Sequence, residues 1–175
     1  ASGSPTNITV SGFLTPASGT VQASLGFVVQ EGDLGTSGDS LRLNSVPLSG
    51  GSLRPSNNFF NSSATALDGS RNVIAFSQRQ PNYSNLLGWD LGLVTADGVL
   101  PPGSNSATLT FDTNGDGYYP QVLAFLVNIY APDLVTTFTK TVSDLNGGDV
   151  LVGDLLEYAV SFSNTGLDGA TNVVV

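Results

Sequence analysis

The motif with the most specific chemistry is the run Asp112-Thr-Asn-Gly-Asp-Gly-Tyr118. Asp112, Asn114 and Asp116 place a carboxylate, an amide and a carboxylate at alternating positions, and a glycine is sixth. The seventh residue, Tyr118, can offer its backbone carbonyl, as in the first half of a calcium-binding loop. The twelfth position, normally a bidentate glutamate, is Leu123. Asn-Gly and Asp-Gly are also strong turn signals, so the sequence favours a hairpin loop between 106–111 and 118–130, with calcium as the alternative.

Aromatic residues are the second group that can bind a ligand. Trp89, Tyr118 and Tyr119, together with Tyr83, can form a platform for sugar rings, as in lectin-like sandwiches. Trp89 lies inside the alternating run 88–95, however, and such an aromatic side chain is more often packed in a core. The sequence therefore favours a core position for Trp89 and keeps carbohydrate binding as the alternative.

Residues that could carry catalysis are scarce. The chain has no histidine, so its many serines lack the usual base that activates a hydroxyl nucleophile. A carboxylate pair for glycoside hydrolysis would have to use Glu31 or Glu157 with an aspartate. Twelve of the fourteen acidic residues are aspartates, and most lie in glycine-rich turns, where backbone structure alone explains them. We predict no catalytic residues and a protein that is not an enzyme.

The composition excludes some partners and favours an extracellular location. A formal net charge of -9 with five basic residues leaves no basic face for nucleic acid. Charged residues make up 11% of the chain, far below the roughly 25% of ordinary soluble domains. No apolar run approaches the ~18 residues needed to span a bilayer. The start Ala1-Ser-Gly-Ser is typical of a secreted chain after signal-peptide removal, with an engineered start as the alternative.

Short strand patterns between glycine-rich turns predict an all-β protein, a β-sandwich of jelly-roll or Ig-like type. Residues 121–130 are apolar on both faces and predict a central strand, and 72–76 predict a short buried strand. Gly26 is expected at a bulge in the long strand 20–30, and 54–66 are expected to form a helical turn or a long surface loop. The other predicted strands are 7–10, 39–46, 88–95 and 106–111.

The segment Tyr130-Ala-Pro-Asp-Leu134 predicts a boundary, because proline ends a strand and a second strand set follows at once. We expect a β-sandwich over 1–131 and the first strands of a second, incomplete Ig-like sandwich over 132–175. Three strands cannot close a sandwich, and their open edges recruit other strands.

Several segments of the second part follow a family pattern: Pro132-Asp-Leu, Thr139-Lys-Thr-Val-Ser-Asp144, Val152-Gly-Asp154, Leu156-Glu-Tyr158, Ser163-Asn-Thr-Gly166 and Ala170-Thr-Asn-Val-Val-Val175. With these, residues 133–175 closely resemble the "domain of unknown function eleven" repeat family, Ig-like modules found in tandem in bacterial surface and secreted proteins. Family members continue with an Asp, a Leu-Pro motif and more strands, which this sequence does not include.

The first part is similar to N-terminal β-sandwich modules that precede such repeats in exported bacterial proteins. The similarity rests on Glu31-Gly-Asp, Ser37-Gly-Asp-Ser-Leu41, Asn58-Phe-Phe-Asn-Ser-Ser63, Gly88-Trp-Asp90, Ala96-Asp-Gly-Val-Leu-Pro101 and Tyr118-Tyr-Pro120. Together the two resemblances imply a cell-surface or fibre-forming structural protein.

Lys140, the only lysine, has a candidate role in related Ig-like surface modules. There a buried strand lysine can condense with an Asn or Asp side chain beside an acid, because burial favours the neutral amine. Glu157 is the candidate acid, and Asn164 or Asn172 the acceptor of this isopeptide bond. The favoured alternative is an exposed lysine that protects a strand edge.

We therefore predict a structural subunit of an extracellular bacterial filament or cell-surface layer. The partner we predict is another copy of the chain, joined head to tail by β-strand complementation. The expected assembly strands are Asn7, Ile8, Thr9 and Val10 at one end and Asn172, Val173, Val174 and Val175 at the other. The alternatives are an adhesin or carbohydrate-binding module that recognises surface glycans or other surface proteins, and the ordered N-terminal part of a longer multi-repeat protein.

Overall fold

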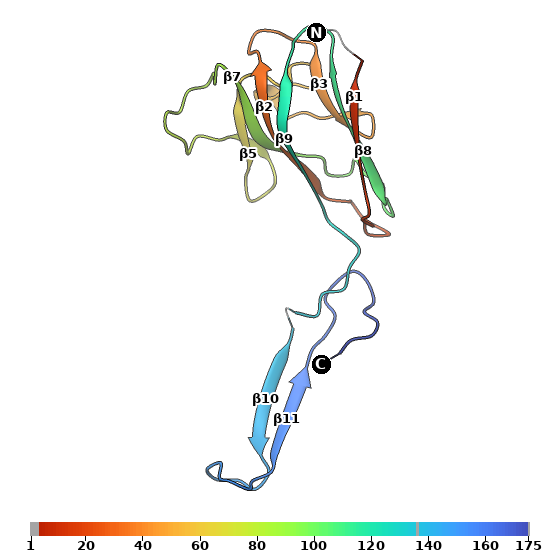
Figure 1. Cartoon of the computed structure of the whole chain (residues 1–175), viewed down its shortest axis with the longest axis vertical. Coiled ribbons are helices and arrows are strands. Elements are labelled where there is room, and N and C mark those ends of the chain that lie inside the picture. Colours follow the sequence, from red (N-terminus) through yellow and green to blue (C-terminus); the bar gives the residue numbers. More distant parts are fainter. Residues whose placement is uncertain (1–3, 136, 175) are drawn as a thin grey trace. The chain divides into compact units, whose positions relative to one another are not determined.

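The structure, a computed structural model, describes residues 4–135 and 137–174. It confirms an all-β protein of sandwich type, with 40% strand and 2% helix (Figure 1). The chain divides into two compact units between Ile129 and Tyr130, two residues before the predicted boundary. Within the described part of the chain, no helix is long and apolar enough to cross a membrane.

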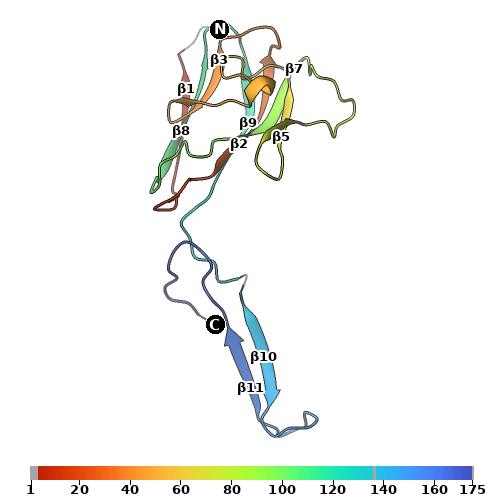
Figure 2. The ribbon, with the colours of Figure 1, turned by 180° about the vertical axis from the view of Figure 1, so that it is seen from behind.

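The first unit is a sandwich of two sheets, seen from behind in Figure 2. The four-stranded sheet has the order β1 (Thr6–Ser11), β8 (Ser106–Thr113), β3 (Asp39–Leu43), β4 (Val46–Pro47). The five-stranded sheet has the order β6 (Val73–Ala75), β5 (Ala64–Leu67), β7 (Gly88–Thr95), β2 (Ala23–Gly32), β9 (Tyr119–Val127). All strand pairs are antiparallel except β5 with β7, which departs from a purely antiparallel jelly roll or Ig fold.

The core forms between the two sheets because alternate residues of each strand point inward. Leu25, Phe27 and Val29 of β2 are buried, and they face the buried residues Leu109 and Phe111 of β8 and their neighbours. An aromatic cluster lies at the centre, where Phe60 stacks on Phe111 at 6.0 Å and contacts Phe27 edge to face at 5.7 Å.

Residues 54–66 were predicted to form a helical turn or a long surface loop, and this prediction is wrong, because much of 54–63 is buried and residues 64–66 belong to β5. The only helical element among the described residues is the short 3-10 helix η1 (Gly51–Leu53), which precedes this segment. Arg54, Phe59 and Phe60 are fully buried. The segment fills the interior because its two phenylalanines supply core volume that the short strands β3, β4 and β5 cannot.

Three strand predictions are also corrected. Residues 121–130 were expected to form a central strand, but β9 is an edge strand of the five-stranded sheet. Residues 72–76 were expected to be buried, but β6 is the opposite edge and Ile74 is exposed. Residues 39–46 form a tight hairpin of β3 and β4, because Asn44 and Ser45 adopt positive φ angles.

The bulge predicted at Gly26 is found elsewhere in the same region. Glu31, with φ of 67°, is the extra residue where the pairing of β2 with β7 shifts. Gln121 is the extra residue where the pairing of β9 with β2 shifts. Gly26 is regularly paired, and a Cβ there would lie 3.1 Å from the side chain of Leu93. Gly26 therefore allows the Leu93 side chain to pack closely against the outer face of the sheet.

The second unit contains one regular element, the antiparallel hairpin of β10 (Thr139–Asp144) and β11 (Leu156–Ser161). Around it, the segment near Asp133 pairs with residues 164–168, and the amide N–H groups of Thr165 and Leu167 donate to Asp133 and Ala131. The hairpin has no further strand paired to it within the described residues. The regular structure of the described part of the second unit is therefore a two-stranded sheet.

Candidate functional site

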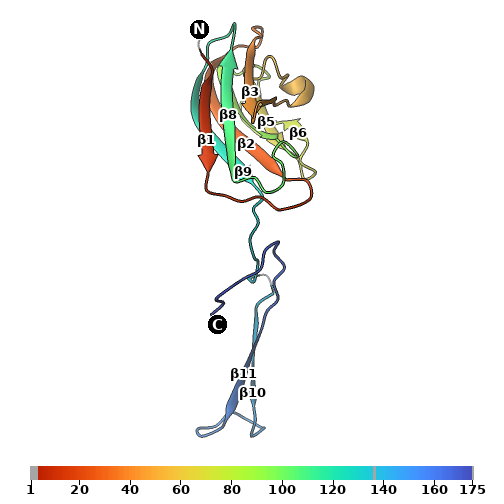
Figure 3. The same ribbon diagram turned by 90° about the vertical axis from the view of Figure 1, so that its right-hand side faces the viewer.

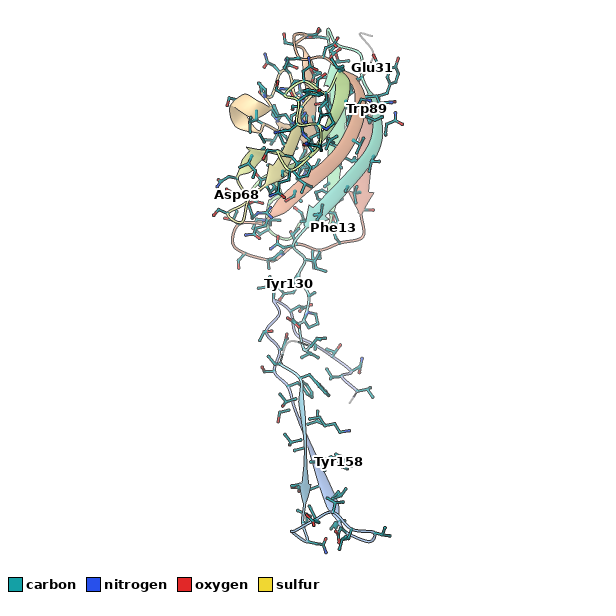
Figure 4. All side chains as sticks on the ribbon, turned by 90° about the vertical axis from the view of Figure 1, so that its left-hand side faces the viewer. Phe13, Glu31, Asp68, Trp89, Tyr130 and Tyr158 are labelled. Carbon is teal, nitrogen blue, oxygen red and sulfur yellow. The ribbon has the colours of Figure 1, made fainter. Side chains whose placement is uncertain are left out.

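The β10–β11 hairpin has one apolar and one polar face. Cross-strand partners point to the same face, so the pairs Lys140–Val160, Val142–Tyr158 and Asp144–Leu156 share one face. This face is apolar except for Lys140 and Asp144 at its two ends. The other face carries Thr141, Ser143, Glu157 and Ala159. Val142 and Tyr158 are exposed, and no further strand of the described second unit pairs with the hairpin. Figure 4 shows Tyr158 on the hairpin. This is the pattern of a sheet whose apolar face belongs inside a sandwich.

The remaining apolar residues of the second unit leave a hollow at the opposite end from the hairpin turn. Its volume is about 360 Å³. Its walls are Leu134, Val135, Phe138, Phe162, Val173 and Val174. Val135 and Val174 are almost fully exposed although both line it. An apolar hollow of this size is loosely packed compared with a protein interior.

The structure does not bring the predicted isopeptide residues together. The Lys140 ammonium lies 4.9 Å from the ring centre of Tyr158, a cation–π contact on the apolar face. Lys140 shares a face with its cross-strand partner Val160. Glu157 lies three residues before Val160 on the same strand, so its side chain is on the opposite, polar face. Asn164 accepts N–H bonds from Asp133 and Gly166, and Asn172 is exposed with φ of 56°. The assignment of Glu157 as the acid is therefore wrong.

The run 112–118 joins β8 of one sheet to β9 of the other, so the predicted hairpin is wrong. The Asp112 carboxylate pairs with Arg42 at 3.4 Å, whereas Asp116 is buried and accepts the N–H of Asp33 at 3.0 Å. The Tyr118 hydroxyl donates to the carbonyl of Asp112 at 3.1 Å. The two carboxylates thus serve different partners. No group of three or more His, Cys, Asp or Glu side chains that could hold a metal ion occurs in the described ranges.

A buried polar centre, which sequence reasoning missed, lies between the sheets. Arg54 and Asp90 form an ion pair of 2.8 Å, and both side chains are fully buried. The Asp90 carboxylate also accepts the N–H groups of Ser62 and Ser63 at 3.0 and 3.2 Å. Arg54 donates further to the Ser63 carbonyl and hydroxyl, at 3.0 and 2.8 Å, and to the carbonyl of Phe59. The centre holds the 54–63 segment in place.

Asp39 lies at the border of this polar centre. One carboxylate oxygen accepts the Phe60 N–H at 2.7 Å, and the other has no hydrogen-bond partner among the described residues. Burial raises the pKa of Asp39 from 3.8 to about 6. Burial also lowers the pKa of Arg54, and the adjacent Asp90 opposes that change. Since these side chains are inaccessible to a substrate, the arrangement stabilises the fold. The feature of the sequence that could have indicated this buried centre is Arg54, which is followed by Pro55 and by the pair Phe59-Phe60.

Two of the predicted ligand aromatics form a row on the outer face of the five-stranded sheet. Gln30 pairs with Trp89 on one side and with Tyr119 on the other, so the three side chains cross β7, β2 and β9. Trp89 is 44% and Tyr119 64% exposed, and the core position favoured for Trp89 is wrong. Figure 4 shows Trp89 near Glu31 at one end of this unit. Successive side chains of a strand point to opposite faces, and Asp90 points inward to Arg54, so Trp89 must point outward.

The other candidate aromatics lie apart from this row. Tyr118 is half-buried, with its ring 4.5 Å from that of Phe60, and burial raises the pKa of its hydroxyl. Tyr83 is exposed in the loop between β6 and β7. Tyr118 therefore belongs to the core, and the aromatic row consists of Trp89, Gln30 and Tyr119.

Of the two predicted assembly segments, the first forms a strand and the described part of the second does not. Asn7, Ile8, Thr9 and Val10 all lie in β1, an edge strand paired only with β8. Asn172, Val173 and Val174 are exposed and belong to no strand, and Val175 lies outside the described residues.

No protein-family model, curated protein or solved structure matches this chain. The family resemblance of 133–175 therefore stays a prediction.

Proposed function

We propose that this protein is a structural subunit of an extracellular bacterial filament or cell-surface layer, assembled by β-strand complementation. The observation that carries the proposal is the apolar face of the β10–β11 hairpin, where Val142 and Tyr158 are exposed and no further described strand pairs with the hairpin. A two-stranded hairpin is marginally stable by itself in water. Covering it with strands from a neighbouring subunit would satisfy backbone groups and remove apolar side chains from water together.

The energetic scale favours assembly over an isolated hairpin. Burying one large apolar side chain contributes roughly 1.5–3 kcal/mol. The apolar face offers Val142, Leu156, Tyr158 and Val160, and the stem of Lys140 can add apolar area. If the hairpin face of one copy contacts a different surface of the next copy, the contact is of the head-to-tail kind, which propagates into fibres when it does not close into a ring.

Lysine substitutions on the two faces of the hairpin test this proposal. Val142→Lys is expected to abolish assembly, because the charge would have to be buried at the contact. Thr141→Lys, its immediate neighbour on the polar face, is the matched control and is expected to assemble like the unchanged chain. Sedimentation velocity and negative-stain electron microscopy of the purified full chain measure the result. Equal assembly of both variants, or a monomeric unchanged chain at high concentration, would contradict the proposal.

The aromatic row favours a second function, binding of a surface polysaccharide. Trp89 and Tyr119 are separated by two strand spacings, about 9–10 Å, and they flank the amide of Gln30. Flat rings at that separation can stack on alternate sugars of an extended chain, while the amide bonds to sugar hydroxyls.

Trp89→Ala is expected to weaken glycan binding at least tenfold, by loss of about 1.4 kcal/mol or more of stacking. Tyr83→Ala removes an exposed aromatic ring outside the row and is the control, expected to bind normally. A glycan array followed by titration of the best ligand measures the effect. If both variants bind like the unchanged chain, or if no glycan binds it, this second function is excluded.

A further inference from the structure

A groove opens between the edge strands β1 and β9 of the first unit. Each is the last strand of its sheet, and Figure 3 shows β1 and β8 in front with β2 and β9 behind them. The groove has a volume of about 450 Å³. Its walls include Thr6, Ile8, Phe111, Tyr118, Tyr119 and Pro120, and none of the residues that line it is charged.

The groove exposes a part of the sandwich core. Ile8 pairs with Leu109 and Thr6 with Phe111, and both partners are buried on the inner face of the sheet. Ile8 therefore points inward as well, yet it is 41% exposed. Further along the seam, Phe13 packs on Phe125 at 5.7 Å and closes it. An inward-facing isoleucine that meets solvent indicates that a strand is missing at this place.

The free edge of β1 is the better backbone partner for such a strand. Its second edge has no partner among the described strands, and residues 6–11 include no proline, so each backbone N–H that points to this edge can donate. At the same level β9 has Pro120, which lacks an N–H, and the unpaired bulge residue Gln121. A strand added to β1 would direct alternate side chains into the groove, over Ile8 and towards Pro120.

We propose that this groove binds residues 170–174 of a second copy of the chain, as a contact of the assembly described above that is additional to the hairpin face; the inference rests on that proposed function. Residues 170–174, Ala-Thr-Asn-Val-Val, are uncharged and rich in β-branched residues. No hydrogen bond involves them within the described residues, and Val174 is 92% exposed.

Charge favours this segment over other parts of a second copy. The first unit carries eight acidic residues and four arginines, and the second carries six acidic residues and one lysine, so two copies repel each other. An uncharged segment entering an uncharged groove adds no repulsion and leaves no buried charge unpaired. Since the groove and the donor segment belong to different units of one chain, each copy can accept a strand with its first unit and donate one with its second.

Two isoleucines with matched exposure provide the first test. Ile8→Lys places a charge in the groove and is expected to weaken assembly at least tenfold in sedimentation. Ile74→Lys is the control, because Ile74 is 42% exposed on β6, the opposite edge strand of the five-stranded sheet. It is expected to assemble normally. Circular dichroism of both variants establishes that they are folded, and equal assembly of the two would overturn the inference.

Cross-linking provides a second test that does not depend on a disruptive substitution. The chain has no cysteine, so the variants Thr6→Cys and Val174→Cys each carry one thiol. Mixed at equal concentration, with one of them enlarged by a tag, they are expected to give a heterodimer with a short bis-maleimide. An Ile74→Cys and Val174→Cys mixture should not.

The outcomes separate this inference from the proposed function. Oligomers without the Thr6 cross-link would overturn the groove assignment and leave the assembly intact. Absence of both oligomers and cross-link would overturn both. A double variant that cross-links only within one chain would show that the groove takes the chain's own segment, and would also overturn the inference.

Discussion

Replacing Arg54 by alanine is expected to lower the free energy of unfolding of the first unit by about 3–5 kcal/mol. The substitution leaves the fully buried Asp90 carboxylate without its only cationic partner, and an uncompensated buried charge is costly. It also removes the donors to the Ser63 carbonyl and hydroxyl. The loss would therefore exceed that of an ordinary ion pair.

Arg42→Ala is the matched control, because Arg42 pairs with Asp112 in a partly exposed position. Surface ion pairs contribute about 0–1 kcal/mol, so this change should be small. Urea unfolding followed by the fluorescence of Trp89, the only tryptophan, compares the variants. The interpretation of the polar centre would be wrong if the two substitutions cost the same. A double variant, Arg54→Met with Asp90→Leu, is expected to recover part of the loss, because no charge then stays buried.

Lowering the pH from 7 to about 4.5 is expected to stabilise the first unit by about 2 kcal/mol, through Asp39. Burial raises the pKa of this carboxyl from 3.8 to about 6 in the folded protein. Between these two values the folded state binds more protons than the unfolded state, so stability rises as the pH falls. The gain is complete below the unfolded pKa, and it is lost as the pH rises through 6.

Asp39→Asn is expected to flatten this dependence, since the amide can still accept the Phe60 N–H and does not titrate. Asp97 has a lowered pKa because Arg71 bonds to it, and Asp68 has one because Asn72 does. Both contribute stability that is lost only as the pH falls below about 4. Urea unfolding between pH 4.5 and 7.5 therefore isolates Asp39. An unchanged slope in the variant would assign the pH dependence to another group.

The amino-acid pattern was sufficient to predict where most of the strands lie along the chain. Runs such as 88–95 and 106–111 correspond closely to β7 and β8, because strand periodicity and turn chemistry act over a few residues. The all-β class follows from the same local signals. The segment 7–10, predicted as an assembly strand, is an edge strand with a free edge.

The pattern was insufficient wherever a residue's environment depends on distant partners. Alternation in 88–95 says that one face is buried but not which one, and hydrophobicity favoured Trp89 as the inward residue. Arg54, 36 positions earlier, decided the opposite by pairing with Asp90. Apolar composition likewise suggested a central position for β9, which is in fact an edge.

The sequence by itself determined strand positions, turn positions, the division near residue 130 and the acidic, sparsely charged surface. All of these depend on neighbours along the chain or on composition alone. Tertiary structure decided which strands are edges and which alternate side chains of a strand face the core. It also decided that Arg54 is buried and that Ile8 lines an open groove. These properties depend on long-range pairing, because two sheets must first meet before a face is buried or a groove is left between them.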